Sequence, residues 1–172
     1  VIGPVVSVCA ALGGVLLANA GLAGDVQTGA DAIVGAIRSG RAAEKFGHMV
    51  AEMGGPPQFV ENWSRFLPEA TIIGEVRSSA NGYVTAIDGE ALGLAVVALG
   101  GGRVIEGDQI NTAVGISDVV RLGAHVSRRA PLAVVHAVRN ADAEKAAQAI
   151  RAAITISPEP VTPPDLIVER VG

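Results

Sequence analysis

The sequence predicts an α+β fold, in which a helical N-terminal part precedes a part that mixes strands and helices. Two observations support this prediction. Apolar residues recur at helical spacing through residues 1–67 of the 172-residue chain. From Pro68 onward, segments rich in β-branched side chains alternate with helical segments. We therefore expect one domain over residues 1–67 and a second domain over residues 68–172.

The composition argues against several classes of function. A formal net charge of −4 and a pI near 5.3 speak against a nucleic-acid partner and against binding to an anionic membrane surface. Cys9 is the single cysteine, so no disulfide can form within the chain. We expect Cys9 to be a small buried hydrophobe and the cytoplasm to be the compartment of the protein.

Residues 1–24 carry no charged side chain and are numerous enough to cross a bilayer. Glycines dilute this apolar run, however, and it lacks the flanking lysine or arginine that a membrane span or a signal peptide requires. We therefore predict a helix of a soluble protein over residues 5–20, buried on most sides. Because the chain begins at Val1 and not at methionine, we expect it to be a cleaved or truncated product.

Two further helices are expected before the composition changes. Asp25 is placed to cap the first, and Gly40 suits the left-handed position at its end. The second runs from about residue 41 to residue 53. Its predicted buried stripe consists of Ala42, Phe46, Met49, Val50 and Met53. His48 falls on the opposite, charged face, and we interpret it as solvated.

Three of the five aromatic residues lie in one short segment after the glycine and proline residues at 54–57. This segment contains Phe59, Trp63 and Phe66, and Leu67 comes directly after it. We interpret the group as a packing plug between the helical part and the next part of the chain. A site that stacks a ligand on these rings is the alternative.

Strands are expected over residues 71–77 and 83–87, which are rich in β-branched side chains. The pair Asn81-Gly82 between them is typical of a tight turn. Asp88 can then cap a helix over residues 89–99.

That helix is expected to end at three glycines followed by an arginine, namely Gly100, Gly101, Gly102 and Arg103. Three successive glycines exceed what one helix cap requires, so this connection is either mobile or closely approached by another segment. Arg103 could meet an anion there, and a flexible surface connection is the alternative. No Gly-Lys-Ser/Thr follows, so the loop is not a P-loop.

The last third of the chain is expected to hold two strands and a helix. The strands are predicted over residues 109–120 and 131–138, and the second is apolar on both faces and therefore internal. Asn140 is placed to cap the helix. A short terminal strand is expected near residues 166–171.

The remaining histidines do not form a metal site in this interpretation. His125 and His136 lie in different segments, without a carboxylate or cysteine at the spacing of metal ligands. We interpret both as structural and expect neither a metal nor a cofactor.

Several short motifs occur along the chain in one order. They are Gly40-Arg-Ala-Ala-Glu-Lys-Phe-Gly-His-Met-Val50, Phe59-Val-Glu-Asn-Trp63, Leu67-Pro68, Gly82-Tyr-Val84, Leu92-Gly-Leu-Ala-Val-Val-Ala-Leu-Gly-Gly-Gly-Arg103, Asp108-Gln-Ile110, Ala113-Val-Gly-Ile-Ser-Asp118, Leu122-Gly123 and Pro131-Leu-Ala-Val-Val-His136. In these motifs the chain resembles the C-terminal portion of the thymidine and pyrimidine-nucleoside phosphorylase family. The triple glycine and Val-Gly-Ile-Ser-Asp resemble the thymidine type more than the broader pyrimidine type.

The resemblance implies an architecture and a reaction. Residues 1–67 would be helices of the large α/β domain, and residues 68–172 would form an α/β-hammerhead domain related to barrel-sandwich hybrids. Phosphate would attack the anomeric carbon of thymidine and give thymine and 2-deoxyribose 1-phosphate, reversibly. Such a reaction needs cationic and amide donors for phosphate and for the charge that develops on the departing base.

The residues that bind phosphate and pyrimidine in the family match no position of this chain, so the resemblance implies no catalytic or substrate-binding residue here. Phosphate and thymidine would be partners of the full-length enzyme, which would be a homodimer formed through a further N-terminal helical domain. This portion would provide one wall of the cleft and its closing loop, for which Gly100, Gly101, Gly102 and Arg103 are the candidates.

Two other functions compete with this interpretation. A barrel-sandwich domain can carry biotin or lipoate on a lysine at a hairpin tip, but Lys45 and Lys145 are the only lysines and both fall in expected helices. A non-catalytic structural or interaction module of the barrel-sandwich type is the stronger alternative. We expect the chain alone to be inactive in phosphorolysis.

Overall fold

The computed structural model describes residues 3–169 and 171, which form two compact units. One unit comprises the chain up to Phe66 together with the residues from Pro164 onward, and the other comprises Leu67–Pro163. The presence of helices together with antiparallel sheets confirms the predicted α+β class. The assignment of residues 1–67 and 68–172 to two family domains stays a prediction.

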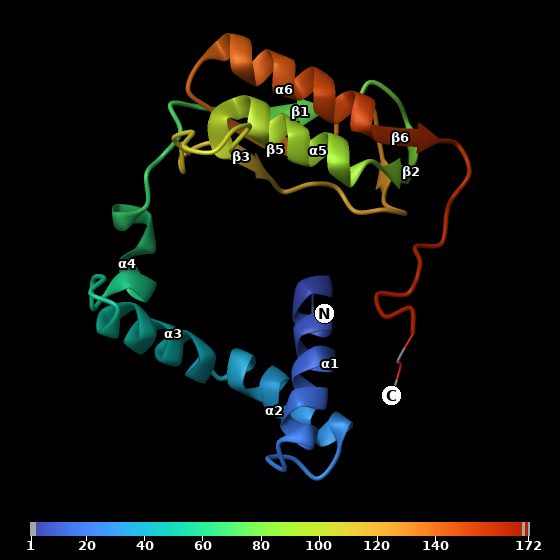
Figure 1. The fold of residues 1–172 in the computed structure, drawn as a ribbon. Coiled ribbons are helices and arrows are strands. Elements are labelled where there is room, and N and C mark those ends of the chain that lie inside the picture. The colour runs from blue at the N-terminus through green and yellow to red at the C-terminus, as the bar shows by residue number, and fades with distance from the viewer. Residues whose placement is uncertain (1–2, 170, 172) are drawn as a thin grey trace. The chain divides into compact units, whose positions relative to one another are not determined.

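The first unit is helical (Figure 1). Its helices are α1 (Pro4–Asn19), α2 (Val26–Arg38), α3 (Arg41–Glu52) and α4 (Phe59–Phe66). Asp25 caps α2 as predicted, because its side chain accepts a hydrogen bond of 2.7 Å from the Thr28 amide. Gly40 takes the predicted left-handed conformation, with φ 85°, between α2 and α3.

Helices α1 and α2 pack closely because each has a glycine at the contact. A Cβ on Gly29 of α2 would lie 2.8 Å from the carbonyl oxygen of Gly14 in α1. A Cβ on Gly14 would in turn lie 2.8 Å from the Ala30 amide nitrogen. The glycines that dilute the apolar N-terminal segment therefore allow two helix backbones to touch.

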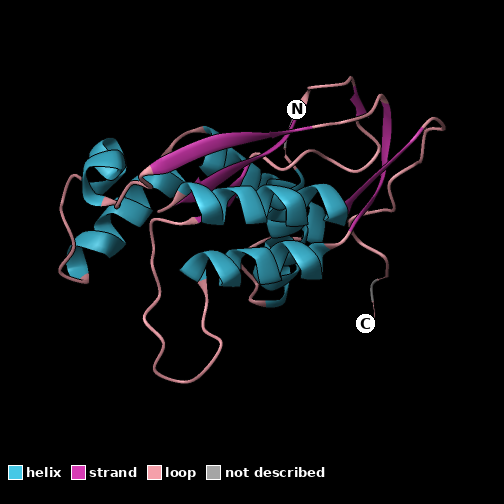
Figure 2. Cartoon of the chain, turned by 90° about the horizontal axis from the view of Figure 1, so that it is seen from above, coloured by secondary structure: helices cyan, strands magenta, loops and turns pink. Residues whose placement is uncertain are grey.

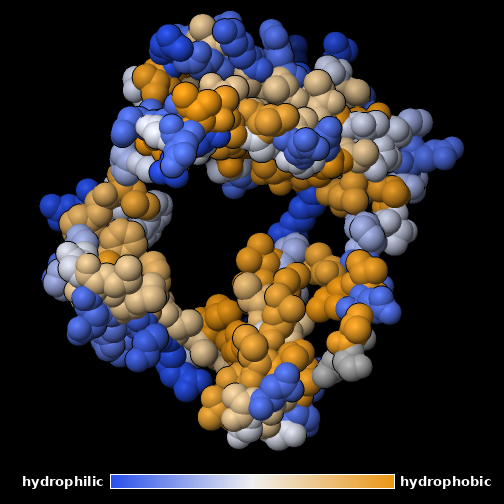
Figure 3. Space-filling view, in the orientation of Figure 1, coloured by the Kyte–Doolittle hydropathy of each residue, from blue (hydrophilic) through white to orange (hydrophobic). Residues whose placement is uncertain are grey.

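Several predictions of burial in this unit are wrong. Helix α1 is not buried on most sides, since Leu16 is 70% exposed and Cys9 is also exposed. The apolar stripe of α3 is open too, with Met49 49% exposed. In the aromatic segment, the ring of Phe59 packs against Phe46 with centroids 6.1 Å apart, and the role of the segment as a plug stays a prediction. The helical spacing of these residues was predicted correctly, but within the described chain the neighbouring helices cover only part of the apolar faces that it creates. Figure 3 shows much of the surface of this unit as hydrophobic.

No helix among residues 3–169 has both the length and the apolar character needed to cross a membrane. Helix α1, which the uncharged N-terminal segment forms, is 16 residues long.

The second unit contains two antiparallel three-stranded sheets. In the first, the strand order is β1 (Ile72–Arg77), β5 (Pro131–Ala137) and β3 (Gly115–Ser117). In the second, the order is β4 (His125–Val126), β2 (Gly82–Ile87) and β6 (Ile154–Ser157). Helix α5 (Gly89–Val96), its continuation η1 (Val97–Gly101) and helix α6 (Asn140–Ala153) pack together over the strands (Figure 1).

One hydrophobic cluster forms the core of this unit. Its fully buried members come from both sheets and from α6, and the largest are Val76, Val84, Leu132, Val135 and Ile150. Strand β5 lies in the middle of its sheet, with Ala133, Val135 and Ala137 buried on one face and Val134 and His136 half-buried on the other. Its central place confirms the prediction of an internal strand.

The predicted tight turn at Asn81-Gly82 does not join two paired strands, because β1 and β2 belong to different sheets. Asn81 instead accepts a hydrogen bond of 2.6 Å from the Arg128 amide. Gly82 has φ 148° and lies against the backbone of β6 at Ser157. Asn81 and Gly82 therefore each contact a segment that is distant in sequence. A pattern of neighbouring residues does not reveal such contacts.

Three other predictions need correction in this part of the chain. The long strand expected over residues 109–120 is reduced to β3, and the rest is loop. Asn140 does not cap α6; the capping position belongs to Arg139, whose guanidinium pairs with Asp142. No strand forms at residues 166–169 or 171, while the sequence did not indicate β6, which directly follows α6.

Candidate functional site

The segment that follows α5 leaves α-helical geometry before it reaches the glycines. Asp88 caps α5 by accepting a hydrogen bond of 2.9 Å from the Ala91 amide. The last turn widens into the π-helical segment η1, and Gly100 inside it has φ 94°. Single π-turns within helices are frequent at functional sites, and this turn directs the chain into the predicted closing loop.

A side chain at either of the next two glycines would crowd the valine side chains of the preceding turn. A Cβ on Gly101 would lie 2.8 Å from Cγ1 of Val96, and a Cβ on Gly102 would lie 2.7 Å from Cγ2 of Val97. The crowding at these two glycines comes mainly from the preceding turn of the same helix, and not from the separate segment that the sequence analysis considered.

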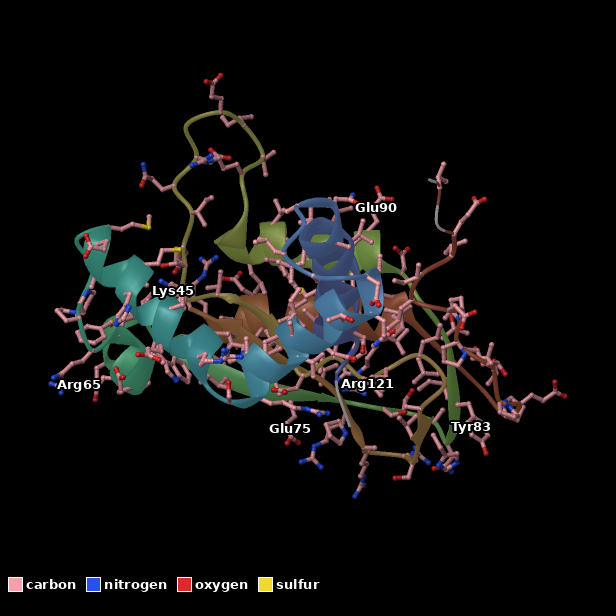
Figure 4. All side chains as sticks on the ribbon, turned by 90° about the horizontal axis from the view of Figure 1, so that it is seen from below. Lys45, Arg65, Glu75, Tyr83, Glu90 and Arg121 are labelled. Atoms are coloured by element: carbon pink, nitrogen blue, oxygen red, sulfur yellow. The ribbon has the colours of Figure 1, made fainter. Side chains whose placement is uncertain are left out.

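The connection from Gly100 to Asn111, which we call the Gly100–Asn111 loop, projects from the second unit (Figures 2 and 4). Its two ends are joined by a hydrogen bond of 2.8 Å from the Asn111 amide to the Gly100 carbonyl. Arg103 is exposed, and its guanidinium makes no hydrogen bond or ion pair within the described part of the chain. It is therefore free to meet an anion.

A carboxylate organises the tip of the Gly100–Asn111 loop. One oxygen of Asp108, Oδ2, accepts hydrogen bonds of 3.0 Å from the amides of both Val104 and Ile105. The Asp108 amide donates to the Ile105 carbonyl at 3.3 Å. These bonds hold the charged form of the side chain, so the backbone amides of Ile105 and then of Val104 lower the pKa of Asp108 from its usual 3.8.

A second polar group, which the sequence did not reveal, lies on the sheet β1-β5-β3. Ser117 Oγ lies 3.0 Å from Nε2 of His136 and donates to Asp118 Oδ2 at 2.9 Å. Strand register explains the meeting, since Ser117 pairs with Val134 and His136 lies two residues further along on the same face. That register was the missing information, because the two residues are 19 positions apart in sequence.

The arrangement of this cluster differs from a catalytic triad. In a triad the histidine lies between the serine and the acid, whereas Asp118 here binds the serine. When the Ser117 proton points to Asp118, His136 Nε2 must be the donor toward Ser117. Asp118 also has a left-handed backbone with φ 52°, which is uncommon for a residue other than glycine. The cluster fits a role in fixing the end of β3.

The other candidate residues lie apart from these two features. The His125 ring packs edge-on against Tyr83 with ring centroids 4.9 Å apart. His48 is exposed on α3, as predicted. Lys45 lies in α3 and Lys145 in α6, so neither is at the tip of a hairpin. Residues 3–169 and 171 bring together no group of three side chains able to hold a metal ion.

Comparison with known families identifies the second unit. Residues 83–157 match the family described as the pyrimidine nucleoside phosphorylase C-terminal domain. This region corresponds to the C-terminal portion of a pyrimidine nucleoside phosphorylase. The match confirms the resemblance found in the sequence motifs, and it concerns a domain of glycosyl-transferring enzymes.

The phosphorylase match extends from β2 to the end of β6. It therefore includes the Gly100–Asn111 loop and the Ser117, Asp118 and His136 cluster. Helices α1 to α4 and strand β1 lie outside it. The residues predicted for loop closure are thus part of the family domain.

Proposed function

We propose that this chain is the C-terminal part of a thymidine phosphorylase, which converts thymidine and phosphate reversibly into thymine and 2-deoxyribose 1-phosphate. The match of residues 83–157 to the C-terminal domain of pyrimidine nucleoside phosphorylases carries the proposal. The preference for thymidine rests on the triple glycine at 100–102 and on the Val114–Asp118 motif, which resemble the thymidine type. We further propose the α/β-hammerhead architecture for the second domain.

In this proposal the chain supplies framework and loop, and the reacting groups lie on another part of the enzyme. Phosphorolysis requires donors around phosphate and stabilisation of the charge that develops on the departing base. Of the described side chains, the exposed Arg103 on its projecting loop is suited to such a role. A loop that closes over bound substrates would also exclude water, which competes with phosphate for the anomeric carbon.

The activity is tested by assaying the complete phosphorylase and the 172-residue chain side by side. Each is mixed with phosphate and either thymidine or uridine, and release of the base is followed. We expect the complete enzyme to act on thymidine faster than on uridine and the chain alone to release no base. Equal rates on the two nucleosides would reduce the proposal to a broad pyrimidine preference. Turnover by the chain alone would overturn the proposal that the reacting groups lie on another part of the enzyme.

A non-catalytic interaction module is the second candidate, and the exposed apolar side chains of the first unit favour it. Met53 is 79% exposed, Trp63 57% and Phe46 46%. Surface of this kind is typical of a contact with another polypeptide. If the complete protein shows no phosphorolysis of any pyrimidine nucleoside, this candidate is preferred.

If the complete protein is an active phosphorylase, we propose that it is a homodimer and that it acts in the cytoplasm.

A further inference from the structure

The Gly100–Asn111 loop is exposed and at the same time internally ordered. Val104 is 79% exposed and Ile105 is 68% exposed, and the loop stands away from the body of the second unit (Figures 2 and 4). Yet both amides at this tip are hydrogen-bonded, and the acceptor is a single side-chain oxygen of Asp108. The tip is therefore shaped by the loop itself and not by packing against the rest of the unit.

Removal of the Asp108 side chain would leave the tip without this restraint. The remaining bond within the tip, from the Asp108 amide to the Ile105 carbonyl, is 3.3 Å long. The bond from Asn111 to Gly100 closes the base of the loop but does not reach the tip. A loop held only at its base samples many conformations, and closure over a substrate must then order it at an entropic cost.

We propose that Asp108 is a positioning residue of the phosphorylase, whose carboxylate preforms the Val104–Ile105 tip so that the loop closes over nucleoside and phosphate as one ordered piece. The inference rests on the proposed function for its catalytic consequence. Ordering of the tip itself does not depend on that function. Asp108 does not contact the substrates in this proposal and acts by fixing the backbone at Val104 and Ile105. Arg103, the residue before Val104, meets the substrates.

Glu106 provides a matched control for Asp108. It is an exposed carboxylate of the same loop, and within the described chain its side chain makes no hydrogen bond. Glu106→Ala therefore removes the same charge from the same loop and leaves the two hydrogen bonds from the Val104 and Ile105 amides to Asp108 in place. We call these two hydrogen bonds the clamp. Asp108→Asn is the conservative variant, since its amide oxygen can still accept from both backbone amides, though as a neutral and weaker acceptor.

The clamp is tested by amide hydrogen exchange of the full 172-residue chain. We expect exchange at Val104 and Ile105 to accelerate about tenfold or more in Asp108→Ala, by less in Asp108→Asn, and not at all in Glu106→Ala. Amides of strand β5 report on the fold and should be unchanged in all three variants. Equal exchange at the tip in Asp108→Ala and the unaltered chain would overturn the proposal.

The positioning role is tested in the complete phosphorylase with the same three variants. We expect kcat/KM for thymidine to fall about five- to tenfold in Asp108→Ala, to be largely restored in Asp108→Asn, and to be unaffected in Glu106→Ala. A larger share of free 2-deoxyribose among the products of Asp108→Ala would show that water enters. Faster exchange with unchanged kinetics would overturn the positioning role. An unaltered enzyme that phosphorolyses no pyrimidine nucleoside would instead overturn the proposed function, while the exchange experiment still decides the clamp.

Discussion

Gly82 lies at the start of strand β2, where β6 leaves no space for a side chain. Its φ is 148°, and a Cβ there would lie 3.0 Å from Cγ2 of Ile156 and nearer still to the Ser157 carbonyl oxygen. We expect Gly82→Ala to lower the free energy of unfolding by about 2 kcal/mol or more, since strain and contact act together. Gly93→Ala in α5 is the control, because nothing lies within 4 Å of that position, and it should be neutral or stabilising by about 0.5–1 kcal/mol. Urea unfolding measures both, and equal stability of the two variants would contradict the close approach.

Arg103 is the residue on which the proposed role of the loop depends. It is exposed and follows three glycines whose geometry directs the loop outward. In the complete phosphorylase we expect Arg103→Ala to lower kcat/KM for thymidine about tenfold, because a cation that meets charged substrate is lost. Arg128→Ala, at an exposed turn outside this loop, should leave the kinetics as they are. Unchanged kinetics in Arg103→Ala would remove the idea that this residue helps hold the closed state.

At the scale of elements, patterns between neighbouring residues predicted the structure well, and pairings between distant segments escaped them. The caps at Asp25 and Asp88 formed as predicted, since each depends on residues three positions away. Asn81 accepts its hydrogen bond from Arg128, 47 positions away in sequence. The local pattern therefore predicted a tight turn between paired strands that does not form. Strand β6 was missed for the same reason, because its pairing with β2 crosses most of the unit.

At the N-terminus of helix α6, an ion pair makes the stability of the fold depend on pH. Arg139 Nε donates to Asp142 Oδ2 at 2.7 Å, and this hydrogen bond, aided by the charges of Arg139 and Lys145, lowers the pKa of Asp142 from its usual 3.8. A carboxyl group with a lowered pKa in the folded state stabilises the fold at pH values above its unfolded pKa. That contribution is lost as the pH falls through the lower, folded value. We therefore expect the difference in Tm between the unaltered chain and Asp142→Ala to be constant near neutral pH and to shrink below about pH 3.8. A difference that does not change between pH 7 and pH 3 would contradict this assignment.

Across the whole molecule, the sequence predicted the kind of protein better than the site. The order of the motifs was enough to indicate the family, and the match over residues 83–157 confirms it. Helical periodicity indicated which faces are apolar but not whether anything covers them, since burial depends on neighbours that a pattern does not contain. The sequence indicated Gly100–Gly102 and Arg103 as loop candidates, and their role stays a prediction. The clamp by Asp108 and the meeting of Ser117 with His136 were not, because both depend on backbone geometry.

The second unit buries more of its large apolar side chains than the first unit. Truncation of such a side chain should therefore lower the free energy of unfolding more in the second unit. Ile150 is fully buried in the cluster of the second unit, whereas Leu16 on α1 is 70% exposed. In the 172-residue chain we expect Ile150→Ala to cost about 2–5 kcal/mol and Leu16→Ala less than about 0.5 kcal/mol. If residues 1–67 belong to the large domain, the complete phosphorylase covers α1, and Leu16→Ala should there cost about 2 kcal/mol or more. Chemical denaturation of both variants in both proteins measures these costs. A negligible cost for Leu16→Ala in the complete enzyme would mean that α1 is a surface helix, and the exposed apolar face would then need a separate partner.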